Sequence, residues 1–469
     1  MKIWDFQKYR NLPAVITDEG ECFYYRDLDQ MQQKFIVNIQ PGSLVCIFAE
    51  NNMASLVAYT ACLINGIVSI MLSVADEREP DHSVLQEFKP DYIWISVGRY
   101  KKRIHGFDGY IESFRLFDYV LLEPVGQIQK KLHPDLALLL PTSGSTGSPR
   151  LVRLSFSNIR TNTESICDYM KITSADRAVT SLPLSYTYGL SLINTLLYSG
   201  GSILLTGESI VRHSFWEHMK QYGVSIFSGV PYTYECMKKL NVKITGLDKL
   251  RMLTQAGGKL TEELQMYWGK YALDEGKQFI VMYGQTEATA RIAYLPGKDC
   301  LKKPGSVGIA IPGTELELMD PTGHRITEAY QEGEIVCRGG QVSMGYAKQS
   351  GDLALGDVNQ GCLYTGDTGH FDRDGYLYID GRMNRFAKIY GKRIDLCSVE
   401  NMASSMWGRE VIVLSDDRKL YMYTDADAAE GDLVLLGRQT GLTGEVLEIR
   451  KWGEIPRRQS GKVMYKIFT

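Results

Sequence analysis

Residues 137–170, ALLLPTSGSTGSPRLVRLSFSNIRTNTESICDYM, place a short apolar strand, a Ser/Gly-rich loop and a helix-like segment in direct succession. In the loop, Pro141–Arg150, two glycines allow tight turns and close approach of a ligand, and hydroxyl groups and one guanidinium add hydrogen-bond donors. The Walker A spacing G-x-x-x-x-G-K-[ST] is absent. The stretch predicts a loop that binds polyphosphate oxygens, although a flexible Ser/Gly turn has the same composition.

Outward from this unit, short apolar and β-branched runs alternate with helix-length segments. The runs are residues 44–49, 91–97, 137–143, 202–207, 224–230 and 279–284. Strands that alternate with helices predict parallel, doubly wound sheets. The apolar run Ser55–Val74 is long enough for a membrane span, but Asn65-Gly66 divides it, which favours a helix followed by a buried strand.

After Pro304 the chain consists of short strands rich in glycine and proline, which predicts an antiparallel or β-barrel-like subdomain. The C-terminal residues mix short strands with polar turns and predict a small α+β domain. We therefore expect an α/β protein with a large domain of doubly wound sheets plus a β-barrel-like subdomain over residues 1–383. The small domain is expected over residues 384–469.

Composition excludes several classes of protein. The 469 residues carry 52 Lys and Arg against 55 Asp and Glu, so no basic stripe for nucleic acid is expected. The nine cysteines form no C-x-x-C pair and the seven histidines no H-E-x-x-H, which argues against structural zinc and a disulfide framework. The N-terminus has no apolar signal region, so we expect a cytoplasmic protein without a membrane span.

Five motifs occur in the order that is found in the adenylate-forming superfamily, and the sequence resembles that superfamily. It comprises acyl- and aryl-CoA synthetases, luciferases and the adenylation domains of peptide synthetases. The motifs are Thr142–Arg150 (T-S-G-[ST]-T-G-x-P-K, with arginine for lysine), Tyr283–Glu287 (Y-G-x-T-E), Thr365–Asp367 (T-G-D), Gly381–Gly391 (G-R-x-x-x-x-x-K-x-x-G) and Pro456–Lys462 (P-[KR]-x-x-S-G-K). The resemblance implies two half-reactions: an acid and ATP give an acyl-adenylate and pyrophosphate, and a thiol then takes the acyl group.

The resemblance also implies the residues that bind ATP and Mg²⁺. The nucleotide set is Thr142, Ser143, Gly144, Ser145, Thr146, Gly147, Arg150, Ala256, Gly257, Gly258, Tyr283, Gly284, Asp367 and Arg382. Within it, Asp367 and Arg382 are expected to hold the ribose, and Tyr283 to stack on adenine. Glu287 is expected to bind Mg²⁺, which prefers one or two carboxylates plus phosphate oxygens, while Thr286 bonds the α-phosphate.

The catalytic lysine and the domain movement are likewise implied by the resemblance. Lys462 is expected to bridge the acid carboxylate and the α-phosphate during adenylation. The small C-terminal domain of the superfamily is mobile and swings about a hinge, and Asn384 stands at the hinge position, where Asp or Lys is usual. The second conformation is expected to bring Lys388 and Gly391 to the site, where Gly391 leaves room for a pantetheine arm. Arg150 in place of lysine predicts altered, bidentate phosphate binding.

The segment Leu182–Leu190 matches the superfamily's segment beside the acyl pocket and contains no acidic residue. Amino-acid activators usually place an aspartate here, and a buried ammonium without a counter-charge is costly. We therefore expect an acid that lacks an α-amine. The residues expected near it are Tyr186, Tyr188, Gly189, Gly229 and Gln285, although the two tyrosines fit ordinary core packing equally well.

The leading hypothesis is an ATP-dependent acid–thiol ligase that acts on a small carboxylic acid. The thiol is that of coenzyme A or of the phosphopantetheine of an acyl or peptidyl carrier protein. The alternative is a stand-alone amino-acid adenylation enzyme that loads a carrier protein, and a third possibility is a nucleotide-binding module without activity. The retained Glu287, Asp367 and Lys462 argue against the third.

Overall fold

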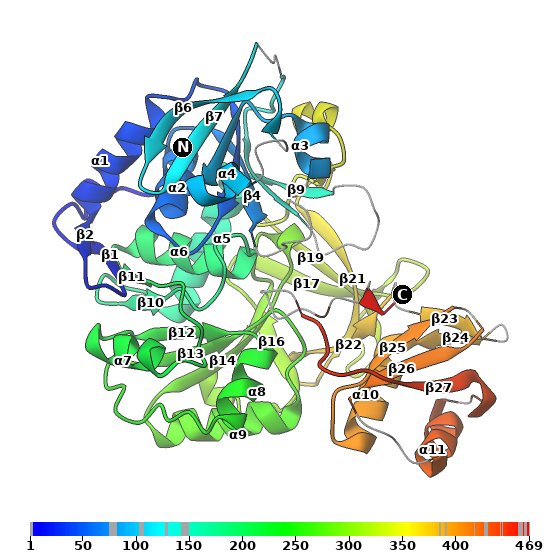
Figure 1. Cartoon of the computed structure of the whole chain (residues 1–469). Helices are drawn as coiled ribbons and strands as arrows, with labels where there is room; N and C mark the ends of the chain where they lie inside the picture. Colours follow the sequence, from blue (N-terminus) through cyan, green and yellow to red (C-terminus); the bar gives the residue numbers. More distant parts are fainter. Residues whose placement is uncertain are drawn as a thin grey trace. The chain divides into compact units, whose positions relative to one another are not determined.

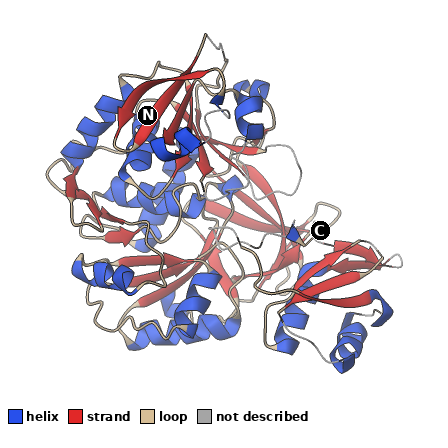
Figure 2. Cartoon of the chain, in the orientation of Figure 1, coloured by secondary structure: helices blue, strands red, loops and turns tan. Residues whose placement is uncertain are grey.

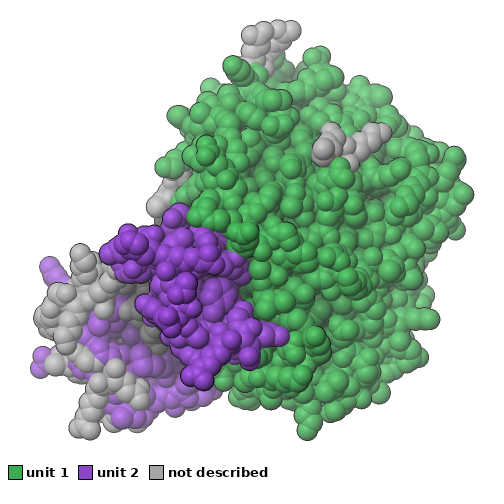
Figure 3. Space-filling model, turned by 180° about the vertical axis from the view of Figure 1, so that it is seen from behind, with its two compact units in different colours: residues 1–315, 338–363 green, residues 316–337, 364–469 purple. Residues whose placement is uncertain are grey.

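The chain forms an α/β structure of two compact units (Figure 1). The structure is a computed structural model, and it describes residues 1–469 except residues 1–2, 75–81, 103–106, 127–129, 142–149, 384–385, 390–391, 417, 426–429, 441, 443, 458–462, 464–466 and 469. Unit 1 consists of residues 1–315 and 338–363, and unit 2 of residues 316–337 and 364–469 (Figure 3). The chain therefore passes between the units after residues 315, 337 and 363.

An eight-stranded sheet of unit 1 has the order β20-β9-β8-β4-β3-β5-β7-β6. Its strands are β3 (Leu44–Ala49), β4 (Val68–Ser73), β5 (Tyr92–Ser96), β6 (Tyr110–Leu116), β7 (Tyr119–Pro124), β8 (Leu136–Pro141), β9 (Leu151–Ser155) and β20 (Tyr346–Ala347). The central strands β8, β4, β3 and β5 are parallel, and antiparallel strands complete both edges. The all-buried pattern of β3 explains its uninterrupted apolar sequence.

The second sheet of unit 1 has the order β16-β15-β14-β13-β12-β10-β11-β1-β2. Its strands are β1 (Pro13–Thr17), β2 (Cys22–Tyr24), β10 (Arg177–Val179), β11 (Ser202–Leu205), β12 (Ile226–Gly229), β13 (Met252–Gln255), β14 (Gln278–Tyr283), β15 (Ala293–Leu295) and β16 (Ser306–Ala310). The strands from β14 to β1 are parallel. The doubly wound α/β prediction is confirmed.

Helices cover these sheets (Figure 2). They are α1 (Tyr25–Ile36), α2 (Met53–Ile64), α3 (His82–Phe88), α4 (Val97–Lys102), α5 (Phe156–Met170), α6 (Thr187–Ser199), α7 (His213–Gln221), α8 (Pro231–Lys239) and α9 (Glu262–Asp274). Helix α5 packs against β8 and β9 and against α6, which packs against β10 and β11, so this helix pair lies between the two sheets. Residues of both sheets and of α2, α5 and α6 share one hydrophobic core.

Local sequence explains where α2 begins and ends. The Asn52 side chain accepts a hydrogen bond from the Ser55 amide at the start of α2, and Gly66 takes a positive φ of 71° just after its end. The predicted division of the Ser55–Val74 run is therefore confirmed. None of the helices that the structure describes has the length and apolar character needed to cross a bilayer.

Unit 2 contains antiparallel strands followed by a small α+β part. The strands are neighbours in the order β18-β17-β19-β21-β22. They are β17 (Thr314–Met319), β18 (Arg325–Ile326), β19 (Gly333–Gly339), β21 (Cys362–Phe371) and β22 (Leu377–Arg382). The small part consists of β23 (Phe386–Ile389), β24 (Lys392–Asp395), α10 (Leu396–Trp407), β25 (Ile412–Ser415), β26 (Leu420–Thr424), α11 (Glu430–Thr440) and β27 (Leu447–Lys451).

The compact units group the antiparallel strands of residues 316–337 and 364–383 with the C-terminal part. The sequence instead predicts a mobile domain that begins at residue 384. A separate core around α10 and the β25-β26-β27 sheet includes Val399, Val413 and Met422, as expected for a small domain. The hinge boundary at residues 383 and 384 stays a prediction.

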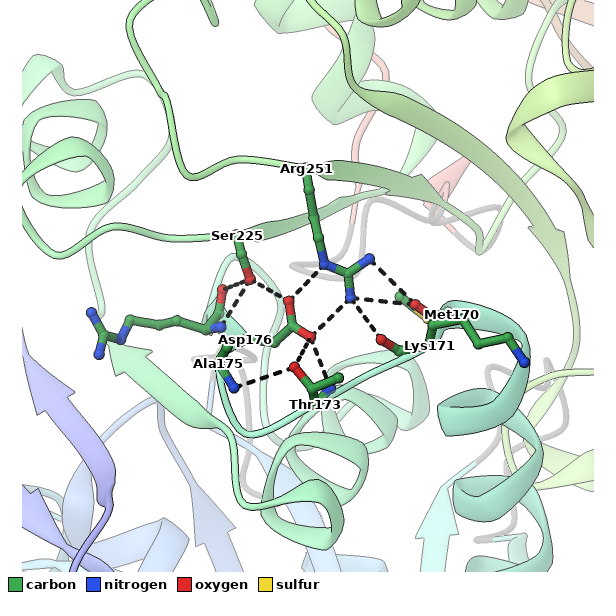
Figure 4. A network of polar contacts seen from close by, with 8 residues as sticks. Met170, Lys171, Thr173, Ala175, Asp176, Ser225 and Arg251 are labelled. Carbon is green, nitrogen blue, oxygen red and sulfur yellow. Dashed lines mark hydrogen bonds and ion pairs between the residues drawn. The ribbon is translucent and has the colours of Figure 1, made fainter.

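An ion pair between the buried Asp176 and the partly exposed Arg251 ties the parallel sheet to α5 (Figure 4). The Asp176 carboxylate, 4% exposed as a residue, accepts hydrogen bonds from Arg251 Nε at 2.7 Å and Nη2 at 2.9 Å. It also accepts from the Ser225 hydroxyl and the Thr173 amide, each at 2.9 Å. The Nη1 and Nη2 atoms of Arg251 also donate to the Met170 carbonyl at the end of α5, each at 3.3 Å. The pair therefore joins the ends of elements that are far apart in the sequence.

Candidate active site

The carboxyl ends of four neighbouring parallel strands supply most of the predicted site in unit 1. In this sheet, β10 lies between β11 and β12, within the order β14-β13-β12-β10-β11. The chain runs from β10 to β11 on one side of β10 and then crosses to β12 on its other side. Ligands of open α/β sheets bind at such a switch point, outside the carboxyl ends of the strands. The expected residues 182–190, 229, 256–258 and 283–287 all follow or end these strands.

Residues Tyr283–Glu287 leave β14 in a tight turn. A Cβ on Gly284 would lie 1.8 Å from the Ala290 carbonyl oxygen, so only glycine fits where the chain folds back on itself. Residues Thr286–Ala288 then form a 3₁₀ turn. The Thr286 hydroxyl shares a hydrogen bond of 2.9 Å with the Thr187 hydroxyl at the start of α6, which links the predicted phosphate contact to the predicted acyl segment.

Glu287 is held by the segment of unit 1 that returns as residues 338–363. The Tyr346 hydroxyl donates to Glu287 Oε1 at 2.8 Å, and the Ser343 amide donates to the Glu287 carbonyl at 2.9 Å. The Arg150 guanidinium lies over the Tyr346 ring, 3.4 Å from its centre. The structure therefore brings Arg150, which replaces the usual lysine, and the predicted metal ligand Glu287 to the same tyrosine.

The Ala256–Gly258 turn packs against a tyrosine of the acyl segment. Gly257 has a φ of 88°, and a Cβ there would lie 2.4 Å from the Tyr186 hydroxyl. The Gln255 side-chain amide donates to the Gly258 carbonyl at 3.0 Å and closes the turn. Both the close approach and the left-handed backbone require glycine, so the turn is built around Tyr186.

Of the other expected pocket residues, Gln285 is partly exposed and Gly189, Gly229 and Tyr188 are buried. Tyr188 takes part in a chain of hydrogen bonds. Its hydroxyl shares a 2.7 Å hydrogen bond with Thr254, which shares another of 2.7 Å with Ser228. A Cβ on Gly189 or on Gly229 would lie within 3 Å of neighbouring atoms, so both glycines are required by close packing. Burial raises the pKa of Tyr186 to about 12, which keeps its hydroxyl protonated at neutral pH.

Asp367 and Arg382 meet within unit 2. They are directly paired across β21 and β22, and Arg382 Nε lies 2.7 Å from Asp367 Oδ1. The Asp367 residue is buried, and its amide donates to the Thr365 hydroxyl at 3.2 Å. The two residues are thus in contact, and their binding of ribose stays a prediction.

Several predicted site residues lie outside the described part of the chain. These are Thr142, Ser143, Gly144, Ser145, Thr146, Gly147, Asn384, Gly391 and Lys462. Lys388 lies on β23, opposite Arg393, and its side chain is likewise outside the description. Pro141 ends β8 and Arg150 precedes β9, so a strand that the sequence analysis did not predict comes before the predicted helix.

Sequence reasoning missed two residues of this region, Tyr346 and Arg291. Nothing in the local sequence of Tyr346 indicates its contact with Glu287, which is 59 positions away. Arg291 could have been noticed, because it is a charged residue in the apolar run Ala290–Leu295. In the part of the chain that the structure describes, no group of three or more His, Cys, Asp and Glu side chains is placed to hold a metal ion.

The fold is that of an α/β protein, and its predicted ligand-binding residues gather at the carboxyl edge of a parallel sheet. The model of the AMP-binding enzyme family matches residues 4–347. The chain belongs to this family, and thus to the adenylate-forming superfamily that its motifs predict.

The chain is also similar to individual proteins and solved structures. The oxalate–CoA ligase of Arabidopsis thaliana is 31% identical over 277 residues, which cover 57% of this chain and 52% of that protein, so the match spans about half the length of that relative. The feruloyl-CoA synthase of an Amycolatopsis species is 26% identical over 497 residues, 98% of this chain and 96% of that protein. The o-succinylbenzoate coenzyme A synthetase of Bacillus subtilis, solved in complex with ATP and magnesium ion, has a TM-score of 0.75 at 20% identity and covers 98% of both chains.

Proposed function

We propose that this protein is an AMP-forming acid–thiol ligase that joins a small carboxylic acid to a thiol at the expense of ATP. In the first half-reaction the acid carboxylate attacks the α-phosphorus of ATP, the bond to pyrophosphate breaks, and an acyl-adenylate forms. In the second, the thiol attacks the acyl carbon and AMP leaves. Membership of the AMP-binding enzyme family gives the class of reaction, and the site supports its chemistry.

The observation that carries the proposal is the fixed Glu287 carboxylate beside Arg150 and Thr286. A carboxylate attacking a phosphate brings two anions together, so the site needs positive charge and oriented donors. Tyr346 orients Glu287 through a 2.8 Å hydrogen bond and lies beneath the Arg150 guanidinium. Thr286, anchored to Thr187, offers a hydroxyl for the α-phosphate.

The residues present fit a magnesium ion bound with ATP. Mg²⁺ prefers hard oxygen ligands, usually one or two carboxylates together with phosphate oxygens, and Glu287 supplies one carboxylate without a preformed cage. Bound there, the ion neutralises phosphate charge. Asp367 and Arg382 are proposed to hold the ribose hydroxyls, and Tyr283 to stack on adenine.

The charge around the acyl segment supports an acid without an α-amine. Residues Leu182–Leu190 include no acid, and the buried Arg291 guanidinium lies over the Tyr188 ring, 4.0 Å from its centre. An ammonium group placed here would meet a like charge in a low-dielectric environment. A stand-alone amino-acid adenylation enzyme is therefore the less favoured alternative.

The remaining parts of the proposal concern the catalytic lysine, the thiol and the location. Lys462 is proposed to bridge the carboxylate and the α-phosphate, and movement about Asn384 to bring Lys388 and Gly391 to the site for the thiol step. The relatives named above are coenzyme A ligases or synthases, which supports coenzyme A as the acceptor; a carrier-protein phosphopantetheine is the alternative. A cytoplasmic location, where ATP and coenzyme A are available, belongs to the same proposal.

Exchange of labelled pyrophosphate into ATP tests the first half-reaction. We expect exchange that depends on Mg²⁺ and on a carboxylic acid, and loss of most of that exchange in Glu287→Gln, which keeps the side-chain shape but removes the charge. Each acid in the panel is paired with its α-amino counterpart. Release of ADP and orthophosphate would contradict the proposal, and a best substrate that is an amino acid would favour the alternative.

A further inference from the structure

Arg291 is an arginine buried inside unit 1 next to the expected acyl pocket. The residue is 1% exposed. Its guanidinium lies over the Tyr188 ring, 4.0 Å from the ring centre, and its Nε contacts the Met282 sulfur at 3.2 Å. The guanidinium is also close enough to Tyr169 and Tyr186 that its positive charge lowers the pKa of both phenols, against the larger opposing effect of burial. A permanent charge is thus enclosed mainly by aromatic rings.

This charge has no acidic partner among the described residues. No ion pair involves Arg291 there, and its Nη2 atom is buried without a hydrogen-bond acceptor. The loop of residues 142–149, which lies outside the description, contains no acidic residue either. A buried guanidinium that is neither paired nor fully hydrogen-bonded is costly, and native proteins seldom keep one without a reason.

Two other arginines of unit 1, the buried Arg153 and the partly exposed Arg251, have partners for their guanidinium groups. Arg153, 0% exposed, donates to the backbone carbonyls of Met344, Tyr346, Leu355 and Gly356. Arg251 pairs with Asp176 in the network of Figure 4. Both of these arginines therefore have clear structural roles. Arg291 differs from them because part of its hydrogen-bonding capacity is unused.

Arg291 borders the expected acyl segment through its guanidinium, which lies over Tyr188, and its backbone contacts a residue that lines a small cavity. The Asn162 side chain donates to the Arg291 carbonyl at 3.1 Å, and Thr187 bonds Thr286 of the Tyr283–Glu287 motif. Asn162 and Thr187 line the same small cavity, together with Thr289. The neighbouring hydroxyls of Tyr188 and Thr254 are neutral. The polar surroundings thus offer one uncompensated positive charge and no negative one.

We infer that Arg291 receives a second carboxylate of the substrate, so that the acid activated by this protein is a dicarboxylic acid. One carboxylate reacts at the α-phosphate and the other binds the unused Nη2 of Arg291. This inference rests on the proposed ligase function and specifies its substrate class. A ligand carboxylate would supply both the missing counter-charge and the missing acceptor, which is the pairing that guanidinium groups make best.

The test compares matched pairs of acids in pyrophosphate exchange: succinate with butyrate, and glutarate with pentanoate. The wild-type protein is expected to prefer the diacid of each pair by about 100-fold in kcat/KM, because a site built around a buried charge rejects an analogue that leaves it unpaired. In Arg291→Met that ratio should fall to about 1 or below, since the counter-charge is then buried without a partner. The ratio of kcat/KM for the diacid to that for the monoacid reports recognition of the second carboxylate. A general loss of folded protein lowers both values equally and leaves this ratio unchanged.

Arg291→Lys provides a second measurement if Arg291→Met does not fold. An ammonium keeps the charge but lacks the planar fork, so the diacid preference should fall only part of the way, by about tenfold. Exchange with monoacids that exceeds exchange with diacids in the wild-type protein would overturn the inference and leave the ligase proposal intact. Absence of exchange with every acid would instead overturn the ligase proposal itself.

Discussion

At the scale of single residues, Tyr346 carries three contacts of different kinds. Its hydroxyl donates to Glu287, its ring supports Arg150, and its carbonyl accepts from the buried Arg153 at 3.2 Å. The carbonyl contact fixes the backbone, and a fixed backbone gives the hydroxyl a defined direction toward the carboxylate. Tyr346 is therefore a positioning residue for the proposed metal ligand, and the contact to Arg150 accommodates an arginine where the superfamily usually has lysine.

We expect Tyr346→Phe to reduce adenylation by about tenfold, because loss of a partner that orients a metal ligand typically costs about 10–100-fold. The ring stacked under Arg150 is retained, so the change should raise the Mg²⁺ concentration needed for half-maximal exchange more than the KM for ATP. Magnesium titration of pyrophosphate exchange measures this. Tyr110→Phe is the control, since the Tyr110 hydroxyl donates to the Pro90 carbonyl instead of a carboxylate. An equal effect of both substitutions on the magnesium requirement would rule out the positioning role.

A second prediction at this scale concerns Gly257, whose φ of 88° and contact with Tyr186 both disfavour a side chain. Gly257→Ala should lower the free energy of unfolding by about 1–3 kcal/mol through backbone strain and should also displace Tyr186. Gly276→Ala is the matched control, because Gly276 has a φ of 67° and no atom lies within 4 Å of the place that a Cβ would take. Urea unfolding of both variants separates strain from the clash.

Restoration by a second substitution sharpens that test. Adding Tyr186→Phe to Gly257→Ala removes the hydroxyl that would lie 2.4 Å from the new methyl carbon. Gly257→Ala is expected to lose more stability than Gly276→Ala, because only Gly257→Ala adds a clash to the backbone strain. The double variant should recover this additional loss. If the two losses are already equal, Tyr186 does not constrain the turn and the close-contact explanation fails.

At the scale of elements, the Asp176–Arg251 pair joins the end of α5 to the start of β10 and to the residue that precedes β13. Burial tends to raise the pKa of Asp176, but hydrogen bonds from Arg251, Thr173 and Ser225 outweigh it and lower the pKa below its usual value. A depressed pKa means that the folded state favours the carboxylate. The resulting stabilisation is present above the pKa of the unfolded state and is lost as the pH falls through the folded pKa.

We expect Asp176→Asn to lower the free energy of unfolding by about 1–2 kcal/mol at pH 7, because Arg251 loses its counter-charge while its guanidinium keeps partial contact with solvent. The difference from the wild-type protein should shrink below about pH 4, where aspartate is protonated in the unfolded chain. Urea unfolding at a series of pH values measures both effects. Asp168→Asn, which removes the exposed partner of Lys171, should change little. A difference that is constant with pH would contradict the ionic explanation.

Sequence patterns predicted most elements but few of the contacts between them. The buried strands β3, β8 and β14 and the division between α2 and β4 follow from local periodicity and from Asn65-Gly66. The predicted β-barrel-like subdomain corresponds to the strands β18-β17-β19-β21-β22 of unit 2. Motifs identified Thr286 and Glu287, whereas Tyr346 and Arg291 depend on packing between distant segments. Such long-range contacts leave no periodic signal in one sequence.

At the scale of the whole molecule, the proposed mechanism requires the small domain to serve two half-reactions in turn. Lys462→Ala should reduce acyl-adenylate formation by about 10²–10³-fold, the usual effect of losing one transition-state donor, while thioester formation from supplied acyl-adenylate stays nearly intact. Gly391→Leu should do the reverse. Asn384→Pro, which restricts the proposed pivot, should also separate the two steps. Pyrophosphate exchange and thioester formation are measured separately for each variant. Equal losses in both steps for Lys462→Ala would contradict domain alternation.

The division of unit 1 between residues 1–315 and 338–363 also bears on how the protein is made. A chain emerging from the ribosome contains Arg153 long before Met344, Leu355 and Gly356, whose carbonyls accept its hydrogen bonds. Unit 1 therefore cannot finish folding as an N-terminal module during synthesis, because a nascent chain that ends at residue 315 would have to bury an unsatisfied guanidinium. Completion of the larger unit waits for the first strands of the smaller one to be translated.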